Sequence, residues 1–173
     1  MENGPAPDTP ELLTDLKKVE SLALRNVQKN IEFARFLKTQ DPQKIESLIK
    51  EIAKDVSSHI DCTECAHCCK SLVVAPDYRD ISVLATHFEI PAADFKKKYF
   101  KKDSEGDLVF KQKPCPFLKN NRCSVYDHRP QLCRRYPYLD QGNVVAELDR
   151  FLRNLSVCPI AYNTFELLKL RFA

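Results

Sequence analysis

The first apolar residues of the chain recur at intervals of three and four, the spacing of a helix with one buried face. They are Leu12, Leu16, Val19, Ala23, Val27, Ile31 and Ala34. Thr9 precedes Pro10, and proline suits the first position of a helix that a hydroxyl side chain caps. The pattern therefore predicts one long amphipathic helix from Thr9 to about Ala34.

A second helix is predicted from Asp41 and Pro42, which repeat the cap-and-proline signal, to about Ser57. Its apolar face consists of Ile45, Leu48, Ile49, Ile52 and Val56. We expect the two helices to form an N-terminal helical hairpin over residues 9–60, whose apolar stripe packs in the core or against a protein partner. Residues 1–8 contain two prolines and no periodic apolar pattern, which predicts a disordered lead-in.

Shorter elements are predicted after residue 61. Helical spacing recurs over residues 77–88, 92–100, 129–136, 151–155 and 164–172. A polar turn at 119–122 separates two short segments, 115–118 and 123–126, which predicts a β-hairpin. The expected fold class is mainly α with a small β-hairpin, in which the N-terminal helical hairpin precedes a cysteine-rich metal-binding unit over residues 61–173.

Composition narrows the kinds of partner. With 173 residues, 43% of them hydrophobic, the chain can bury one ordinary core. It lacks both a run of about 20 apolar residues and a secretory signal, so we expect no membrane span and a cytoplasmic location. The net charge is only +3, and the lysines between positions 96 and 102 suit a solvated helix face, so no nucleic-acid partner is expected.

The eight cysteines all lie between positions 62 and 158. Thiols stay reduced in the cytoplasm, so this pattern predicts metal binding before disulfides. Cys62, Cys65 and Cys68 repeat the Cys-x-x-Cys spacing, which lets sulfurs converge on one ion. They match the first three ligands of a bacterial ferredoxin run, but Leu72 stands where the fourth would be, so a distant ligand is required. The remote thiols, enough for one or two four-coordinate sites, are Cys115, Cys123, Cys133 and Cys158.

Cys68 and Cys69 are adjacent, and adjacent side chains in a helix or strand point apart. We therefore do not expect both to bind one ion in simple geometry. One of them is then a ligand to a second metal, a reactive thiol, or a small buried apolar residue.

Other side chains near the cysteines also have a functional and an ordinary interpretation. His67 and His128 could each replace a sulfur ligand, although a lone histidine is more often a plain polar residue. Arg129, Arg134 and Arg135 could meet a substrate or redox partner. For Arg134 and Arg135, which follow Cys133, we favour the simpler role of offsetting the negative charge of several thiolates.

Two segments carry a resemblance to a known family, CTECAHCC at 62–69 and CPFLKNNRCSVYDHRPQLCRRYP at 115–137. They resemble the YkgJ family of cysteine-cluster proteins, for which zinc or iron chelation is described. That family often has glycine where this chain has Ala66. The resemblance covers about residues 62–158 and carries a second signature of Tyr126, Arg129, Pro130, Cys133, Arg134 and Pro137. It implies as metal ligands Cys62, Cys65, Cys68, Cys69, Cys115, Cys123, Cys133 and Cys158.

The predicted function is binding of zinc or iron through thiolates, where iron could be present as an iron–sulfur cluster. The alternative is an iron–sulfur-dependent enzyme or redox protein, for example in protein lysine methyl transfer, because the domain also resembles part of the flagellin lysine methylases. With only three glycines the chain has no G-x-G loop for a nucleotide-derived cofactor, and no C-x3-C-x2-C run, so we lean against an enzyme and assign no catalytic residue. A third hypothesis is a thiol redox sensor at Cys68 and Cys69.

Overall fold

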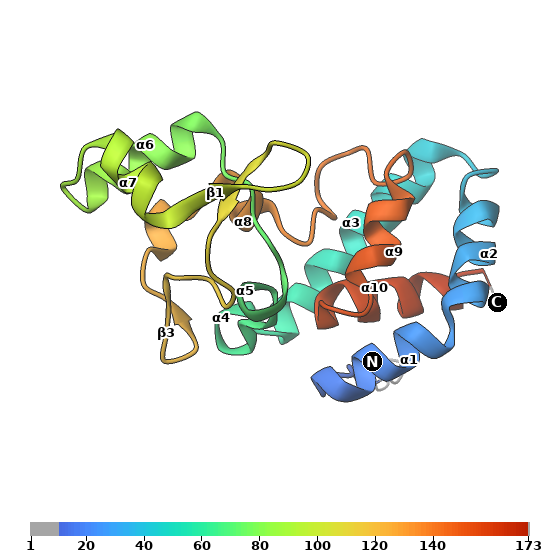
Figure 1. The fold of residues 1–173 in the computed structure, drawn as a ribbon. Coiled ribbons are helices and arrows are strands. Elements are labelled where there is room, and N and C mark those ends of the chain that lie inside the picture. The colour runs from blue at the N-terminus through green and yellow to red at the C-terminus, as the bar shows by residue number, and fades with distance from the viewer. Residues whose placement is uncertain (1–10, 173) are drawn as a thin grey trace, which may run out of the picture.

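The computed structural model describes residues 11–172, so the predicted lead-in at 1–8, Thr9 and Pro10 lie outside the described residues. The described chain is mostly helical, as predicted, with two small antiparallel strand pairs. Its helices form two groups on opposite sides of the molecule (Figure 1). The larger group consists of α1 (Leu16–Arg25), α2 (Val27–Leu37), α3 (Pro42–His59), α9 (Leu148–Asn154) and α10 (Pro159–Leu170). The smaller group consists of α6 (Tyr78–His87) and α7 (Ala92–Tyr99).

The single long helix predicted for the N-terminal region is wrong in two respects. Residues 11–15 are not helical, and α1 begins at Leu16, where the Asp15 side chain accepts hydrogen bonds from the backbone N–H groups of Lys17 and Lys18. The helix also ends at Asn26, whose side-chain amide donates to the Leu22 carbonyl over 3.0 Å. Asparagine competes with the helix in this way because its side chain mimics a backbone group. The chain then starts again as α2.

The second predicted helix is confirmed as α3, which Asp41 caps through the N–H groups of Gln43 and Lys44. Its main packing partner is α10, from the far end of the chain, and α1 also packs on α10 (Figure 1). The first hydrophobic core therefore joins residues 19–60 with residues 139–168. Fully buried members include Val19, Ile45, Ile49, Leu148 and Phe165.

The second core is aromatic and belongs to α6, α7 and the strands. The rings of Phe95 and Phe117 lie in stacked planes, and Phe88 stacks on both. β1 (Phe100–Lys102) pairs with β2 (Leu108–Phe110), so that Phe100 faces Phe110. Cys115 and Cys123 pack against this core as partly buried side chains. Two of the predicted ligands are thus held by the second core.

The predicted β-hairpin is present but short, with β3 (Leu118–Lys119) paired to β4 (Arg122–Cys123). Its turn consists of Asn120 and Asn121, both with positive φ, the conformation that suits the twist of a two-residue hairpin. Five further cysteines lie on short helices, α4 (Cys62–Cys65), α5 (His67–Ser71) and α8 (Gln131–Arg135), and Cys158 directly precedes α10. The 3-10 helix η1 (Tyr126–His128) lies between β4 and α8. No helix among residues 11–172 has both the length and the apolar character needed to cross a membrane.

Buried Asn163 fixes the non-helical start of the described chain against α10. Its side chain accepts a hydrogen bond from Leu13 N–H over 2.8 Å and donates to the carbonyls of Leu13 and Pro159 over 2.8 and 2.7 Å. We predict that Asn163→Ala lowers the free energy of unfolding by about 2–3 kcal/mol, because it removes three bonds and leaves backbone groups without partners. Chemical denaturation followed by circular dichroism measures the loss.

Asn143→Ala is the matched control. Asn143 is exposed and its amide bonds only the Glu147 carboxylate, over 2.8 Å. The expected loss is below about 0.5 kcal/mol. Equal losses for the two variants would contradict the role given to Asn163.

Candidate metal centre

The run from Cys62 to Cys69 folds as two short helices joined by a left-handed residue. Asp61 begins α4 by accepting hydrogen bonds from the N–H and hydroxyl of Thr63, both over 2.7 Å. Buried Ala66 then takes φ 49°, ψ 15°, a conformation in which glycine has no steric cost, and this explains the family's frequent glycine here. α5 follows at once, so Cys68 and Cys69 lie one turn beyond the bend.

Backbone contacts bring the second cysteine-rich segment to this pair of helices. The N–H of Cys115 donates to the carbonyl of Cys69 over 2.8 Å. At the tip of the β3–β4 hairpin, the side-chain amide of Asn121 donates to the carbonyl of Glu64. These bonds fix Cys115 and Cys123 beside α4 and α5, and α4, α5 and α8 lie between the two helix groups (Figure 1).

Four thiols interact electrostatically in every pairwise combination. They are Cys69, Cys115, Cys123 and Cys133, which we call the second thiol group. Burial is the main reason that the pKa of Cys115 rises to about 11 and that of Cys133 to about 12, and the charge of Cys69 raises both further. Because such effects weaken steeply with distance, the four sulfurs face a common region.

Backbone amides also surround the sulfurs of this group. The N–H groups of Phe117 and Leu118 lower the pKa of Cys115, and that of Val125 lowers the pKa of Cys123, in each case against the larger effect of burial. Amides that point at sulfur offset thiolate charge, as expected of a metal-binding loop.

The other four cysteines are Cys62, Cys65, Cys68 and Cys158, which we call the first thiol group. Buried Cys158 precedes α10, and its pKa rises to about 12 because burial and the charges of Cys65 and Cys62 outweigh the amides of Ile160 and Ala161. The charge of Cys158 in turn raises the pKa of Cys68. The start of α10 therefore carries a distant thiol that interacts with the Cys-x-x-Cys run.

Cys68 and Cys69 stand where the two groups meet. A hydrogen bond between their side chains is the largest cause that lowers the pKa of Cys69 to about 7 and raises that of Cys68 well above its usual range. Arg129 and Lys70 also lower the pKa of Cys69. The two adjacent cysteines also interact with thiols of both groups, since Cys68 interacts with Cys158 and Cys133, and Cys69 acts on Cys62 as well as on the second thiol group.

Arg129, more than Arg134 or Arg135, compensates the charge of the cysteines. It lowers the pKa of four of them, Cys62, Cys69, Cys123 and Cys133. Its guanidinium lies 3.7 Å from the centre of the Tyr126 ring, and its buried Nε has no hydrogen-bond partner among the described residues. The Arg134 side chain donates instead to the carbonyls of Arg129 and Asp127, and so supports the loop that carries Arg129.

The two histidines considered as ligands contact other groups. His67 Nε2 lies 3.1 Å from the hydroxyl of Ser71, and the His128 ring lies 4.3 Å from that of His87. Two residues near the thiols were not predicted from the sequence, Asp61 and Tyr136. Asp61 precedes a polar helix turn, which is a recognisable cap signal, whereas no local signal marks Tyr136.

The donor chemistry fits zinc or iron, because both accept four thiolates. Seven of the eight thiols are partly or fully buried, and none forms a disulfide within the described residues. No three Cys, His, Asp or Glu side chains of residues 11–172 already stand close enough together to hold an ion. Binding therefore requires the thiols to close around the metal, which is the usual coupling of metal binding to local folding.

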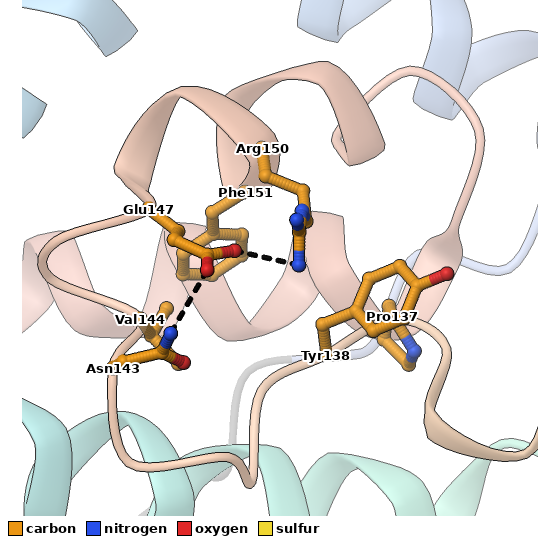
Figure 2. Close-up of a pocket in the computed structure, with 7 residues that line it drawn as sticks. All are labelled: Pro137, Tyr138, Asn143, Val144, Glu147, Arg150 and Phe151. Carbon is orange, nitrogen blue, oxygen red and sulfur yellow. Dashed lines mark hydrogen bonds and ion pairs between the residues drawn. The ribbon is translucent and has the colours of Figure 1, made fainter. Parts of the chain in front are cut away.

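A small pocket lies between the segment after α8 and the start of α9 (Figure 2). It is lined by Tyr138, Glu147 and Arg150, among others, and Glu147 joins Arg150 over 2.6 Å and Asn143 over 2.8 Å. Its volume of about 10 Å³ holds one water molecule at most, so it is no substrate pocket.

Comparisons with known proteins agree with this geometry. The family model CxxCxxCC, described as "Putative zinc- or iron-chelating domain", matches residues 61–159, more than half of the chain. The chain is also 32% identical over 81 residues to the uncharacterized protein MJ0661 of Methanocaldococcus jannaschii, and this match covers 44% of the chain and 43% of that relative. No solved structure matches the chain. The resemblance predicted from the cysteine segments is thus confirmed, and the chain belongs to the CxxCxxCC family of zinc- or iron-chelating domains.

Proposed function

We propose that this chain is a metal-binding protein that holds two zinc or iron ions, one in each thiol group. The observation that carries the proposal is the convergence of Cys69, Cys115, Cys123 and Cys133, which come from four separate segments and all interact. Four thiolates are a complete tetrahedral set for either metal. The first thiol group offers a second set, with Cys158 as its distant member.

The adjacent positions of Cys68 and Cys69 in α5 suit two neighbouring ions better than one ion with spare thiols. Cys68 interacts with Cys158 and Cys69 with Cys115, and weaker interactions of Cys68 with Cys133 and of Cys69 with Cys62 cross between the two groups, as expected of sites that lie side by side. Eight thiolates around two divalent ions leave an excess negative charge. The guanidinium of Arg129, which interacts with cysteines of both groups, offsets part of that charge.

Elemental analysis and a visible absorption spectrum of protein purified without oxygen test the proposal. About two zinc ions per chain and a colourless solution support a structural zinc protein. Iron with sulfide and a brown absorption band supports a cluster. A chain without bound metal that also takes up neither zinc nor iron would overturn the proposal. No contact among the described residues favours the enzymatic alternative, and we do not propose it.

Cysteine variants test the division into two groups. We predict that Cys65→Ala, Cys158→Ala and Cys115→Ala each lose about one of two ions, since a site that lacks one of four ligands releases its metal. The double variant Cys65→Ala/Cys158→Ala should lose no more than either single variant. Cys65→Ala/Cys115→Ala should lose both ions and unfold at lower denaturant concentration.

The cysteine variants also have outcomes that would contradict the division of the eight thiols into two groups. If Cys65→Ala/Cys158→Ala loses twice as much metal as its single variants, the two cysteines serve different ions. If every single variant loses all metal, the thiols form one site.

The affinity for zinc should rise with pH. The raised pKa values of Cys115, Cys133 and Cys158 keep these thiols protonated in the metal-free chain at neutral pH, so zinc must displace their protons. Each displaced proton changes the apparent affinity about tenfold per pH unit, and affinity is lost as pH falls. Competition with a chromophoric chelator between about pH 6 and pH 8 measures the slope. A constant affinity over this range would show that the thiols are already ionised.

A further inference from the structure

The hydroxyl of Tyr136 is buried and has no hydrogen-bond partner among the described residues. Tyr136 directly follows α8, and its side chain packs against the first core, the core that also contains Cys158. A buried hydroxyl without an acceptor is unfavourable, because it has lost its hydrogen bonds to water and forms none within the protein. Such a group in a folded chain calls for a specific explanation.

The segment that carries this hydroxyl lies close to Cys158, because Asn154 donates to the carbonyl of Pro137 over 3.1 Å and accepts a hydrogen bond from the N–H of Cys158 over 2.9 Å. Burial is the main cause that raises the pKa of Tyr136 well above its usual range, and the charges of Cys158, Cys68 and Cys65 raise it further. A tyrosine O–H has a proton that it can donate to a sulfur. Three elements supply these cysteines: the end of α4, α5, and the residue before α10.

A thiol and a thiolate differ sharply as acceptors. Neutral sulfur accepts a hydrogen bond weakly, whereas an ionised acceptor roughly doubles the strength of the bond. A tyrosine hydroxyl beside protonated cysteines can therefore form only a weak hydrogen bond. The same hydroxyl beside the thiolates of a bound metal can form a strong one.

We propose that the Tyr136 hydroxyl donates a hydrogen bond to a metal-bound thiolate of the first thiol group, and is thereby a positioning residue for that metal. The inference rests on the proposed function and adds to it a specific determinant of affinity. Donors of this kind orient the sulfur and reduce its charge, which tunes how tightly the metal is held.

Removal of the hydroxyl should then have opposite effects in the two forms of the protein. In the metal-free chain, Tyr136→Phe removes an unpaired buried polar group, so resistance to denaturant should rise or stay constant. In the loaded chain, the same substitution removes a bond to a thiolate, so the metal should be held less tightly. Phenylalanine keeps the ring and its packing, which separates the hydroxyl from the shape of the side chain.

Tyr138→Phe is the matched control, because it removes a hydroxyl two residues away. The Tyr138 ring lies against Arg150, 5.1 Å from its guanidinium, and its hydroxyl points away from the Asn143–Glu147–Arg150 group (Figure 2). Burial is the main cause that raises the pKa of Tyr138, and the charges of Cys133 and Cys68 raise it further, but its hydroxyl is not among the buried groups that lack a partner. Its loss should leave metal affinity within about twofold of wild type.

The experiment titrates zinc into the full-length chain and both variants in competition with a chromophoric chelator. We expect Tyr136→Phe to lower the affinity for one of the two zinc ions by about 10- to 100-fold. With cobalt in place of zinc, the sulfur-to-cobalt absorption band should move to longer wavelength in Tyr136→Phe alone, because a hydrogen bond stabilises the sulfur lone pairs.

Each outcome separates this inference from the proposed function. A wild-type chain that binds neither metal overturns both. A wild-type chain that binds metal while Tyr136→Phe matches it in affinity and in the cobalt spectrum overturns only the role of Tyr136. A metal-free Tyr136→Phe that is less stable than wild type, with unchanged affinity, would show that the hydroxyl serves the fold.

Discussion

The hydrogen bond from Cys115 N–H to the carbonyl of Cys69, 2.8 Å long, joins two segments that are 46 positions apart in the chain. Everything at the candidate metal centre depends on this junction, because Cys115 packs on the aromatic core while Cys69 belongs to the short helix beside the first core. A backbone bond holds the two cysteines in register whatever the protonation of their sulfurs. The bond therefore keeps the Cys115 and Cys69 segments together before any ion is present, and the sulfurs close around the metal when it binds.

Burial and charge oppose each other at this junction. Burial favours protonated thiols and raises the pKa of most of them, while Arg129, backbone amides and the start of α10 favour thiolates. A divalent ion resolves the conflict because it replaces the protons and neutralises the charge within the same small volume. The arrangement of Arg129 over Tyr126 adds a fixed cation that does not leave when the metal does.

The sequence predicted the elements whose signals are local. The cap at Asp41, the helices α6 and α7, and the turn at Asn120–Asn121 all follow from a few neighbouring residues, and all are present. The break at Asn26 was missed because apolar spacing continues through it, and only the bond from the Asn26 side chain to Leu22 reveals the bend. The partner of α3 could not be predicted, since an apolar stripe is the same whether it meets α2 or α10.

For the candidate site, cysteine spacing predicted a set of thiol donors and the need for a distant thiol. It could not assign Cys158 to one group and Cys115 to the other, because that depends on which core each segment packs against. Arg129 was predicted from the sequence only as part of a family signature and as a residue that could meet a substrate. Its interactions with cysteines of both groups depend on the fold. The role of Tyr136 depends on burial, which no residue pattern around it encodes.

Helix α10 begins beside Cys158 and, five residues later, presents Asn163 to Leu13. The same helix thus has the Cys158 sulfur at its N-terminus and, little more than one turn later, binds the first described residues through Asn163. If Cys158 becomes more ordered, the hydrogen bonds between Asn163 and Leu13 should open less often. Amide hydrogen exchange at Leu13 would then slow, and would report on a change at the distant thiols. In this chain, the backbone near Leu13 is therefore a position at which changes at the cysteines can be detected.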